Sequence, residues 1–206
     1  MYQPTHFKEE RPHIQHALIK SHPFGLLVSA GPDGPEANGI PFLLDAAAGS
    51  LGILTAHVAR ANSQWKTINA QNVLAIFQGP QAYISPSHYE TKRETGKVVP
   101  TWNYVMVQVR GTAILHDNRD WLLAHVNALT NSHEQERLQP WSVSDAPADY
   151  IESQLRGIVG IEVIISHIDA KWKVSQNRPQ DDQRGVADGL AATHPDMAAL
   201  VRLAKS

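Results

Sequence analysis

Alternation between apolar and polar residues dominates this chain and predicts many short β-strands. The clearest example covers residues 104–115, where Val105, Val107 and Val109 fall on one face of the strand. The pair Asp33-Gly34 separates two further apolar runs and is typical of a β-hairpin turn. Other segments with strand character lie at 25–30, 36–45, 51–56, 72–78, 81–85 and 158–168, the last of which extends into 171–175.

Helical periodicity occurs between these strands and after them. Apolar residues at spacings of three and four predict a helix over 120–131. Shorter helices are expected at 13–20, 63–70, 147–155 and 195–205. Residues 176–189 are polar and rich in Asp, Gln and Arg, which indicates a solvent-facing loop. Many short strands with few helices favour a mainly β fold, an antiparallel β-barrel with peripheral helices, over a doubly wound parallel sheet.

Composition limits the classes of function. The formal net charge of −2 gives no general attraction for nucleic acid or for an anionic membrane. The absence of cysteine excludes disulfides, thiolate metal sites and cysteine nucleophiles, and it suits the reducing cytoplasm. The polar start and the lack of a long uninterrupted apolar stretch argue against a signal peptide and a membrane span. We therefore expect a cytoplasmic protein.

The densest group of polar residues lies between Thr55 and Trp65, at the end of a predicted strand. It contains Thr55, His57, Arg60, Asn62 and Gln64. A strand end followed by an arginine and the start of a helix suits an anion, because guanidinium and free backbone N–H groups both bind phosphate. The alternative is that Asn62 or Ser63 only caps the helix and Arg60 is solvated.

Two further polar segments are candidates for ligand contact. The long excursion at 85–104 is typical of a ligand-covering loop, in which Trp102 could line an aromatic ring, although a simple surface loop fits equally. The segment at 170–178 contains Lys171, Lys173 and Arg178, which suits either the second half of a phosphate site or an ordinary basic strand.

The common signatures of other chemistries are missing. Eleven histidines occur, but none forms the His-Glu-x-x-His motif, and we predict no metal site; His125 is interpreted as a core or surface residue. The dinucleotide-binding glycine fingerprint, the phosphate loop and the Gly-x-Ser-x-Gly elbow are absent.

Seven segments in order along residues 1–190 carry a resemblance to a known family. They are 1–7, 22–25, 40–44, 57–62 (His-Val-Ala-Arg-Ala-Asn), 99–104 (Val-Pro-Thr-Trp-Asn-Tyr), 155–160 and 171–178 (Lys-Trp-Lys-Val-Ser-Gln-Asn-Arg). Together they resemble the PaiB family of FMN-binding split-barrel proteins, which are described as negative transcriptional regulators and are related to pyridoxamine phosphate oxidases. The resemblance implies an FMN-binding split barrel over residues 1–190. It leaves residues 191–206 as a C-terminal helix packed on the same domain or across a dimer.

The resemblance also implies a homodimer with two FMN sites in the subunit interface. By analogy with the oxidases, Thr55 would lie by the flavin and Arg60 would hold the phosphate. Ala59 and Ala61 replace the oxidase Ser and Lys, so other side chains must complete the phosphate site. The resulting cofactor-binding set is Thr55, His57, Arg60, Asn62, Gln64, Trp102, Asn103, Lys173, Gln176 and Asn177, with the last three approaching from the partner subunit.

Three functions remain open at this stage, and no catalytic residue is assigned. The first is a regulatory or sensing FMN protein, although the sequence contains no helix-turn-helix segment with an obvious basic recognition face, which weighs against DNA as a partner. The second is a flavin-dependent oxidoreductase acting on a small molecule with a separate reductant. The third is a split barrel that binds haem.

Overall fold

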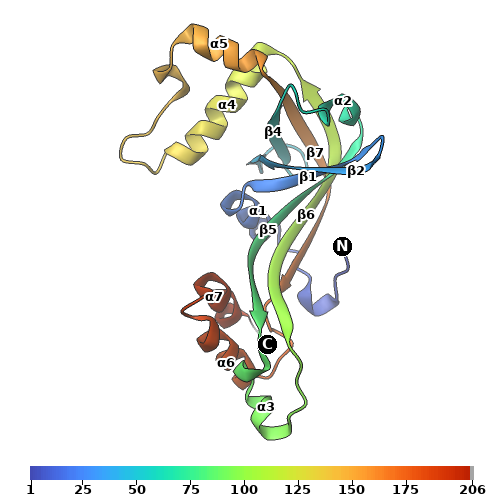
Figure 1. Ribbon diagram of the computed structural model, residues 1–206, viewed down its shortest axis with the longest axis vertical. Helices are drawn as coiled ribbons and strands as arrows, with labels where there is room; N and C mark the ends of the chain where they lie inside the picture. Colours follow the sequence, from blue (N-terminus) through green and yellow to red (C-terminus); the bar gives the residue numbers. More distant parts are fainter. Residues whose placement is uncertain (205–206) are drawn as a thin grey trace. The chain divides into compact units, whose positions relative to one another are not determined.

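The computed structural model describes residues 1–204 of the chain (Figure 1). Its elements are, in chain order, η1 (Thr5–Phe7), α1 (Pro12–Ser21), β1 (Phe24–Gly31), β2 (Gly34–Pro41), β3 (Leu43–Asp45), β4 (Ile53–Ala59), α2 (Trp65–Ile68), β5 (Asn72–Ile84), η2 (Pro86–His88), α3 (Glu90–Thr95), β6 (Thr101–His116), α4 (Arg119–Glu134), η3 (Val143–Asp145), α5 (Ala148–Arg156), β7 (Ile158–Lys173), α6 (Gln180–Leu190) and α7 (Pro195–Leu203). No helix among these residues is long and apolar enough to cross a membrane.

Seven strands form one sheet in the order β2-β1-β5-β6-β7-β4-β3. Strands β1 and β2 form the predicted hairpin, in which Gly31 pairs with Gly34 at the turn. Gly34 has φ +117°, a conformation that favours glycine. Strands β4 and β7 pair antiparallel, with His57 opposite Gly160. The prediction of a mainly β, antiparallel fold with peripheral helices is confirmed.

Several predicted boundaries need correction. The segments 72–78 and 81–85 belong to one long strand, β5, and the predicted strand 36–45 divides into β2 and β3 at the buried Phe42. The predicted helix 63–70 contracts to the single turn α2. The expectation of a loop over 176–189 is wrong, because residues 180–190 form α6. Its buried face includes Val186, Ala187 and Leu190, so packing stabilises a helix that its two glycines disfavour.

The chain divides into two compact units, each built from separate stretches of sequence. The first unit contains residues 1–18, 78–107 and 169 onward, and the second contains residues 19–77 and 108–168. In the second unit, Phe42 packs edge-on against Phe77 with ring centroids 5.3 Å apart. In the first unit, α7 packs against α6 and buries Met197. The predicted C-terminal helix is thus α7, while Lys205 lies outside the described residues.

Candidate functional site

Arg60 follows the end of β4 in the second unit and is tied to its own chain. Its Nε donates to the carbonyl oxygen of Arg156 at 2.8 Å, and one terminal nitrogen donates to the carbonyl of Ile158 at 2.9 Å. Both terminal nitrogens contact the carboxylate of Asp117. Hydrogen bonding from Arg60 lowers the pKa of that carboxyl group. The predicted phosphate anchor therefore already holds one carboxylate and two backbone oxygens.

The Arg60 side chain opens onto a cavity of about 480 Å³, which we call the Arg60 pocket. Its lining residues are Arg60, Asp117, Arg119, Leu122, Glu152, Leu155 and Arg156. Three guanidinium groups and two carboxylates leave a net charge of +1, since three positive and two negative charges face the same space. Guanidinium groups bind phosphate well because their planar N–H donors match its oxygens.

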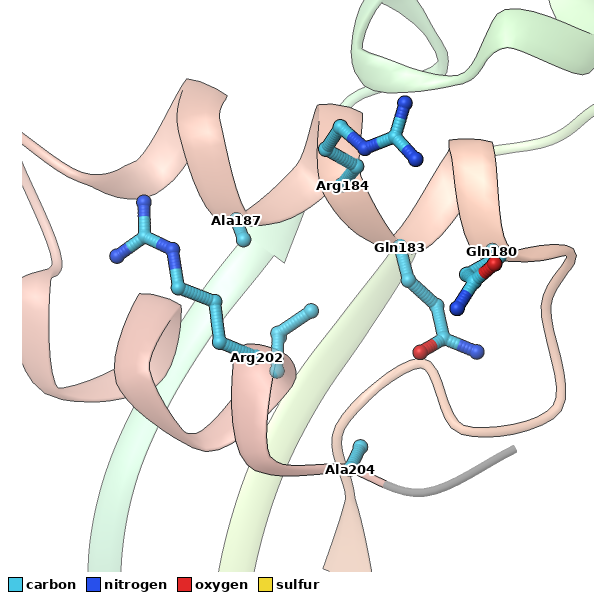
Figure 2. A pocket seen from close by; sticks show the side chains of 7 residues that line it. Gln180, Gln183, Arg184, Ala187, Arg202 and Ala204 are labelled. Atoms are coloured by element: carbon cyan, nitrogen blue, oxygen red, sulfur yellow. The ribbon is translucent and has the colours of Figure 1, made fainter.

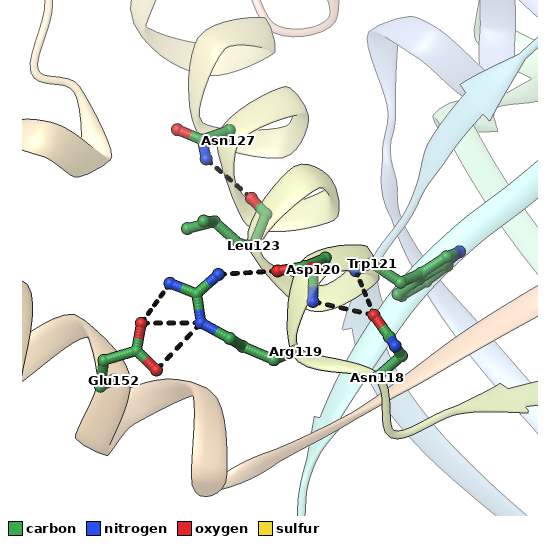
Figure 3. Close-up of polar contacts among 7 residues, drawn as sticks. All are labelled: Asn118, Arg119, Asp120, Trp121, Leu123, Asn127 and Glu152. Atoms are coloured by element: carbon green, nitrogen blue, oxygen red, sulfur yellow. Dashed lines mark hydrogen bonds and ion pairs between the residues drawn. The ribbon is translucent and has the colours of Figure 1, made fainter.

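The three arginines of this pocket differ in how they are held. Arg119 pairs with Glu152, with Nε 2.9 Å from a carboxylate oxygen, and with Asp120 (Figure 3). Asn118 accepts hydrogen bonds from the backbone N–H groups of Asp120 and Trp121, and so caps the start of α4. The guanidinium group of Arg156 makes no hydrogen bond or ion pair with any residue from 1 to 204. Arg156 is therefore the cation of the pocket most available to a ligand.

Gln64 and Asn62 occupy structural positions next to this region. The Gln64 side chain is fully buried, and its Nε2 donates to the carbonyl of Leu27 at 3.1 Å and to Oγ of Ser29 at 3.0 Å. The Asn62 side chain accepts from the Gln64 backbone N–H at 2.9 Å, but no side chain caps α2. The expected helix cap is thus replaced by a turn around Asn62. The Gln64 amide is already engaged with β1, so its assignment to the cofactor stays a prediction.

Thr55 and His57 lie on one face of β4, because side chains alternate along a strand. Helix α4 places His125 over both of them. His125 Nε2 lies 3.1 Å from His57 Nδ1, and His125 Nδ1 lies 3.2 Å from the Thr55 hydroxyl. Burial, together with the neighbouring His57, lowers the pKa of His125 to about 4, and burial lowers the pKa of His57 as well. Both rings are therefore neutral at pH 7 and share one hydrogen bond.

A stack of aromatic rings supports this histidine pair. Trp121 of α4 stacks on His125 at 5.3 Å and on His116 at 4.1 Å between ring centroids. Gly160 of β7 makes the stack possible, because a Cβ at that position would lie 2.2 Å from a carbon of the Trp121 ring. Sequence reasoning identified Trp121 and His125 as one helical face but missed their contact with β4. No sequence motif at Trp121 or His125 indicates which strand the residue contacts.

The first unit holds the other half of the predicted set, at the start of β6 and the end of β7. Lys173 Nζ donates to the carbonyl of Trp102 at 2.8 Å and to the hydroxyl of Thr101. Burial, and then the positive charges of Lys171 and Arg178, lower the pKa of Lys173. Trp102 is 53% exposed and meets Tyr83 edge-on.

The remaining predicted residues of the first unit surround the turn after β7. Asn103 is buried and donates to Oγ of Ser175 at 2.8 Å. Ser175 has φ +67°, an unusual value for a residue other than glycine. The Gln176 amide closes on the backbone of Trp172 and Val174, whereas Asn177 is exposed. Five of the predicted residues lie in each unit, and their assembly into one site across a subunit interface remains a prediction.

Comparison with known proteins identifies the family. The family model described as "Putative FMN-binding domain" matches residues 1–167. A Bacillus subtilis protein named protease synthase and sporulation protein PAI 2 is 33% identical over 92% of this chain and 89% of its own. The chain belongs to the FMN-binding PaiB family. An uncharacterized protein from Emericella nidulans is 35% identical over 92% of this chain and 90% of its own.

The PaiB assignment agrees with the fold. The flavocytochrome Anf3 from Azotobacter vinelandii has a TM-score of 0.59 at 14% identity, over 81% of this chain and 69% of that chain. At this identity the likeness concerns the fold alone. The predicted fold and the predicted cofactor, FMN, are both confirmed at the level of the family. The donor set of the Arg60 pocket suits the phosphate of this cofactor, because three guanidinium groups reach one cavity.

Proposed function

We propose that this PaiB protein is a cytoplasmic homodimer that senses or regulates through bound FMN, whose phosphate is held at the Arg60 pocket. The observation that carries the proposal is the cavity at the end of β4, where three arginines meet and the guanidinium group of one, Arg156, makes no hydrogen bond or ion pair among residues 1–204. Bound FMN would supply hydride and electron chemistry that the side chains lack. The chain's own residues bind and orient it.

Binding of a phosphate requires an exchange at Arg60. The Asp117 carboxylate is about two thirds exposed, so water can solvate it when a phosphate takes its place. Arg60 keeps its bonds to the carbonyls of Arg156 and Ile158 during this exchange, which hold the guanidinium in position. Arg156 then contributes a cation without breaking a contact of its own.

The direct test is titration of FMN and riboflavin by fluorescence quenching. Arg60→Ala is expected to weaken FMN binding by roughly 1.5–3 kcal/mol, the usual loss for a charge-assisted contact, and to leave riboflavin binding nearly unchanged. Arg156→Gln should weaken FMN binding without disturbing the fold, because it breaks no side-chain hydrogen bond or ion pair within residues 1–204. Arg137→Ala is the control, since Arg137 pairs with Glu134 at the end of α4 and does not line the Arg60 pocket. Unchanged FMN affinity in both pocket variants would falsify the assignment.

The dimer is supported by the outer face of the sheet in the second unit. Leu26 pairs with Ile76 and Val28 with Leu74, and these positions are incompletely buried. Phe24 is 69% exposed beside them. A largely apolar face on a sheet, bordered by Arg110, suits a second copy of the chain, which would cover it with the same face. Leu26→Lys should convert the dimer to a monomer in light scattering; an unchanged mass would exclude this face.

A flavin-dependent oxidoreductase is the second candidate, favoured by the chain of hydrogen bonds from Thr55 through His125 to His57. Neutral imidazoles can pass a proton along such a chain by exchanging donor and acceptor roles. Anaerobic addition of NAD(P)H should bleach the flavin absorbance if the protein is such an enzyme. Under the regulatory proposal the flavin band persists.

A Soret band in the purified protein would instead indicate haem, and salt-dependent gel shifts would indicate DNA binding.

A further inference from the structure

The first unit carries an exposed pair of aromatic rings on the outer face of its sheet. Trp102 of β6 is 53% exposed, Tyr83 of β5 is 49% exposed, and their rings meet edge-on with centroids 6.0 Å apart. The two strands are neighbours in the sheet, and along them Trp102 alternates with the buried Asn103 and Tyr83 with the buried Ala82. Both rings therefore face solvent on the side away from the core. A planar ligand can stack on such rings.

Three cations lie on the neighbouring strand and in the turn that follows it. Lys171 and Lys173 belong to β7, which pairs with β6, and Arg178 comes five residues later. None of the three pairs with a carboxylate in residues 1–204. Lys173 Nζ donates to the Trp102 carbonyl at 2.8 Å and to the Thr101 hydroxyl, so one of its three N–H groups is left for a ligand.

Aromatic rings, and not carboxylates, hold the other two cations. The Arg178 guanidinium carbon lies 4.7 Å from the ring centre of Tyr89, whose side chain is buried. Lys171 Nζ lies 5.2 Å from the ring centre of Tyr104 and 5.4 Å from that of Tyr2. Contacts of this kind hold a cation in place but do not neutralise its charge. The Arg178 guanidinium can therefore bind an anion without giving up an ion pair.

The electrostatic surroundings of Lys173 are positive as a result. Burial, and then the charges of the other two cations, lower its pKa. The carboxylates at the two ends of this segment have other partners: Asp169 lies 3.2 Å from the α-amino group of Met1, and Asp182 accepts two hydrogen bonds from Thr91. An anion at this surface supplies the negative charge that the neighbouring side chains do not give to Lys173.

The other arginines of residues 169–204 form a contrast with Arg178. Arg184 and Arg202 line the cavity between α6 and α7, and Figure 2 shows their guanidinium groups apart from each other. Each already has a carboxylate partner, Asp181 at 3.1 Å and Asp188 at 3.2 Å. Arg178 is thus the one arginine in this part of the described chain without an ion pair, and it lies beside Lys173 and the exposed rings.

We propose that a nucleoside diphosphate, free or as part of a pyridine dinucleotide, binds the surface formed by Tyr83, Trp102, Lys173 and Arg178. The base stacks on the two rings, and the phosphate groups accept hydrogen bonds from Lys173 Nζ and from the Arg178 guanidinium. All four residues belong to the first unit, whereas Arg60 belongs to the second. The proposal therefore does not depend on FMN phosphate binding at the Arg60 pocket. Trp102 and Lys173 also belong to the predicted FMN set, so the variants that separate the two ligands are at Tyr83 and Arg178.

The binding test titrates ADP into FMN-loaded protein by calorimetry and follows the indole N–H signal of Trp102 by NMR. Adenosine lacks the phosphates and pyrophosphate lacks the base, so each should bind roughly tenfold more weakly than ADP or worse. Arg178→Met and Tyr83→Ser should each weaken ADP binding roughly tenfold, and thermal unfolding checks that both variants fold. Arg184→Met is the matched control, because Arg184 is an exposed arginine that already has a carboxylate partner. Absence of ADP binding, equal binding of pyrophosphate, or an equal loss in Arg184→Met overturns the proposal.

A competition test separates this surface from the flavin site. ADP should bind FMN-loaded and FMN-free protein equally well, and Arg60→Ala should weaken FMN binding but leave ADP binding unchanged. Arg178→Met and Tyr83→Ser should show the reverse pattern. Competitive displacement of ADP by FMN would assign Trp102 and Lys173 to the flavin alone and overturn the proposal. Binding of NADH roughly tenfold tighter than that of ADP would identify the dinucleotide as the ligand, and equal binding would identify the free nucleotide.

Discussion

Arg60 and Lys173, the two cations that the resemblance assigns to one cofactor site, have opposite surroundings. Arg60 holds the Asp117 carboxylate and two backbone carbonyls. Lys173 contacts only the neutral oxygens of Thr101 and Trp102, and it pairs with no carboxylate in the described part of the chain. A paired cation must exchange a partner to bind an anion, whereas an unpaired one gains a new contact. Lys173 is therefore the more available anion site, although Arg60 lies in the recognised motif.

The two regions also differ in what holds them together. Next to Arg60, helix α4 covers β4 with a stack of rings that includes Trp121 and His125. Next to Lys173, two further cations, Lys171 and Arg178, lie close enough to lower its pKa. We expect changes of packing to dominate in the Arg60 region and changes of charge to dominate in the Lys173 region.

The largest expected effect is the pH dependence that His125 gives to the second unit. Its pKa falls from 6.5 to about 4 on folding, so the unfolded chain binds a proton more readily than the folded one. The contribution of the neutral His125 ring to the free energy of unfolding is fully present above pH 6.5 and is lost as the pH falls towards 4. The shift corresponds to roughly 3 kcal/mol.

Denaturant unfolding between pH 4 and pH 7 measures this effect. His125→Gln should flatten the dependence in that window, although it lowers stability at pH 7. His133→Gln is the control, because His133 is exposed on the same helix. An equally steep pH profile in His125→Gln would contradict the role of the buried ring.

Gly160→Ala tests the packing of the Arg60 region from the strand side. The added methyl group collides with the Trp121 ring, and we expect a loss of roughly 2–3 kcal/mol in unfolding free energy. Gly189→Ala in the first unit is the matched change, because its methyl group would lie 2.1 Å from Nδ1 of His88. The His88 ring is not held between two other rings as Trp121 is between His116 and His125, so it can move aside and this loss should be smaller. Equal losses would show that Trp121 is no more fixed than His88.

The sequence predicted most of the fold and only part of the site. Strand alternation located β6, and helical spacing located α4, because both patterns reflect burial against the same core. The prediction from sequence failed at α6, because Gly185 and Gly189 disfavour a helix in isolation. In the folded protein the same glycines allow the close contact with His88. The ion pair of Arg60 with Asp117 joins residues 57 positions apart, and no local pattern encodes such a contact.

Lys173→Met tests the role of positive charge in the region around Lys173. Methionine keeps much of the apolar stem but removes the ammonium group, and FMN affinity should fall by roughly 1.5–2 kcal/mol if Lys173 binds the phosphate. Riboflavin, which lacks the phosphate, should bind almost as before. Lys97→Met is the control, since the Lys97 side chain is exposed and makes no hydrogen bond or ion pair with residues 1–204. Equal loss for FMN and riboflavin would place Lys173 beside the ring system instead.

The smallest expected effect is the loss of the ion pair between Arg119 and Glu152. The pair joins α4 to α5 through several contacts (Figure 3). Both side chains are solvent-accessible, so water and salt screen their attraction. Glu152→Gln should leave the unfolding midpoint close to that of the unmodified protein. It should also raise the net charge of the Arg60 pocket from +1 to +2 and strengthen FMN binding. Weaker binding in this variant would show that Glu152 positions Arg119 and does not merely neutralise it.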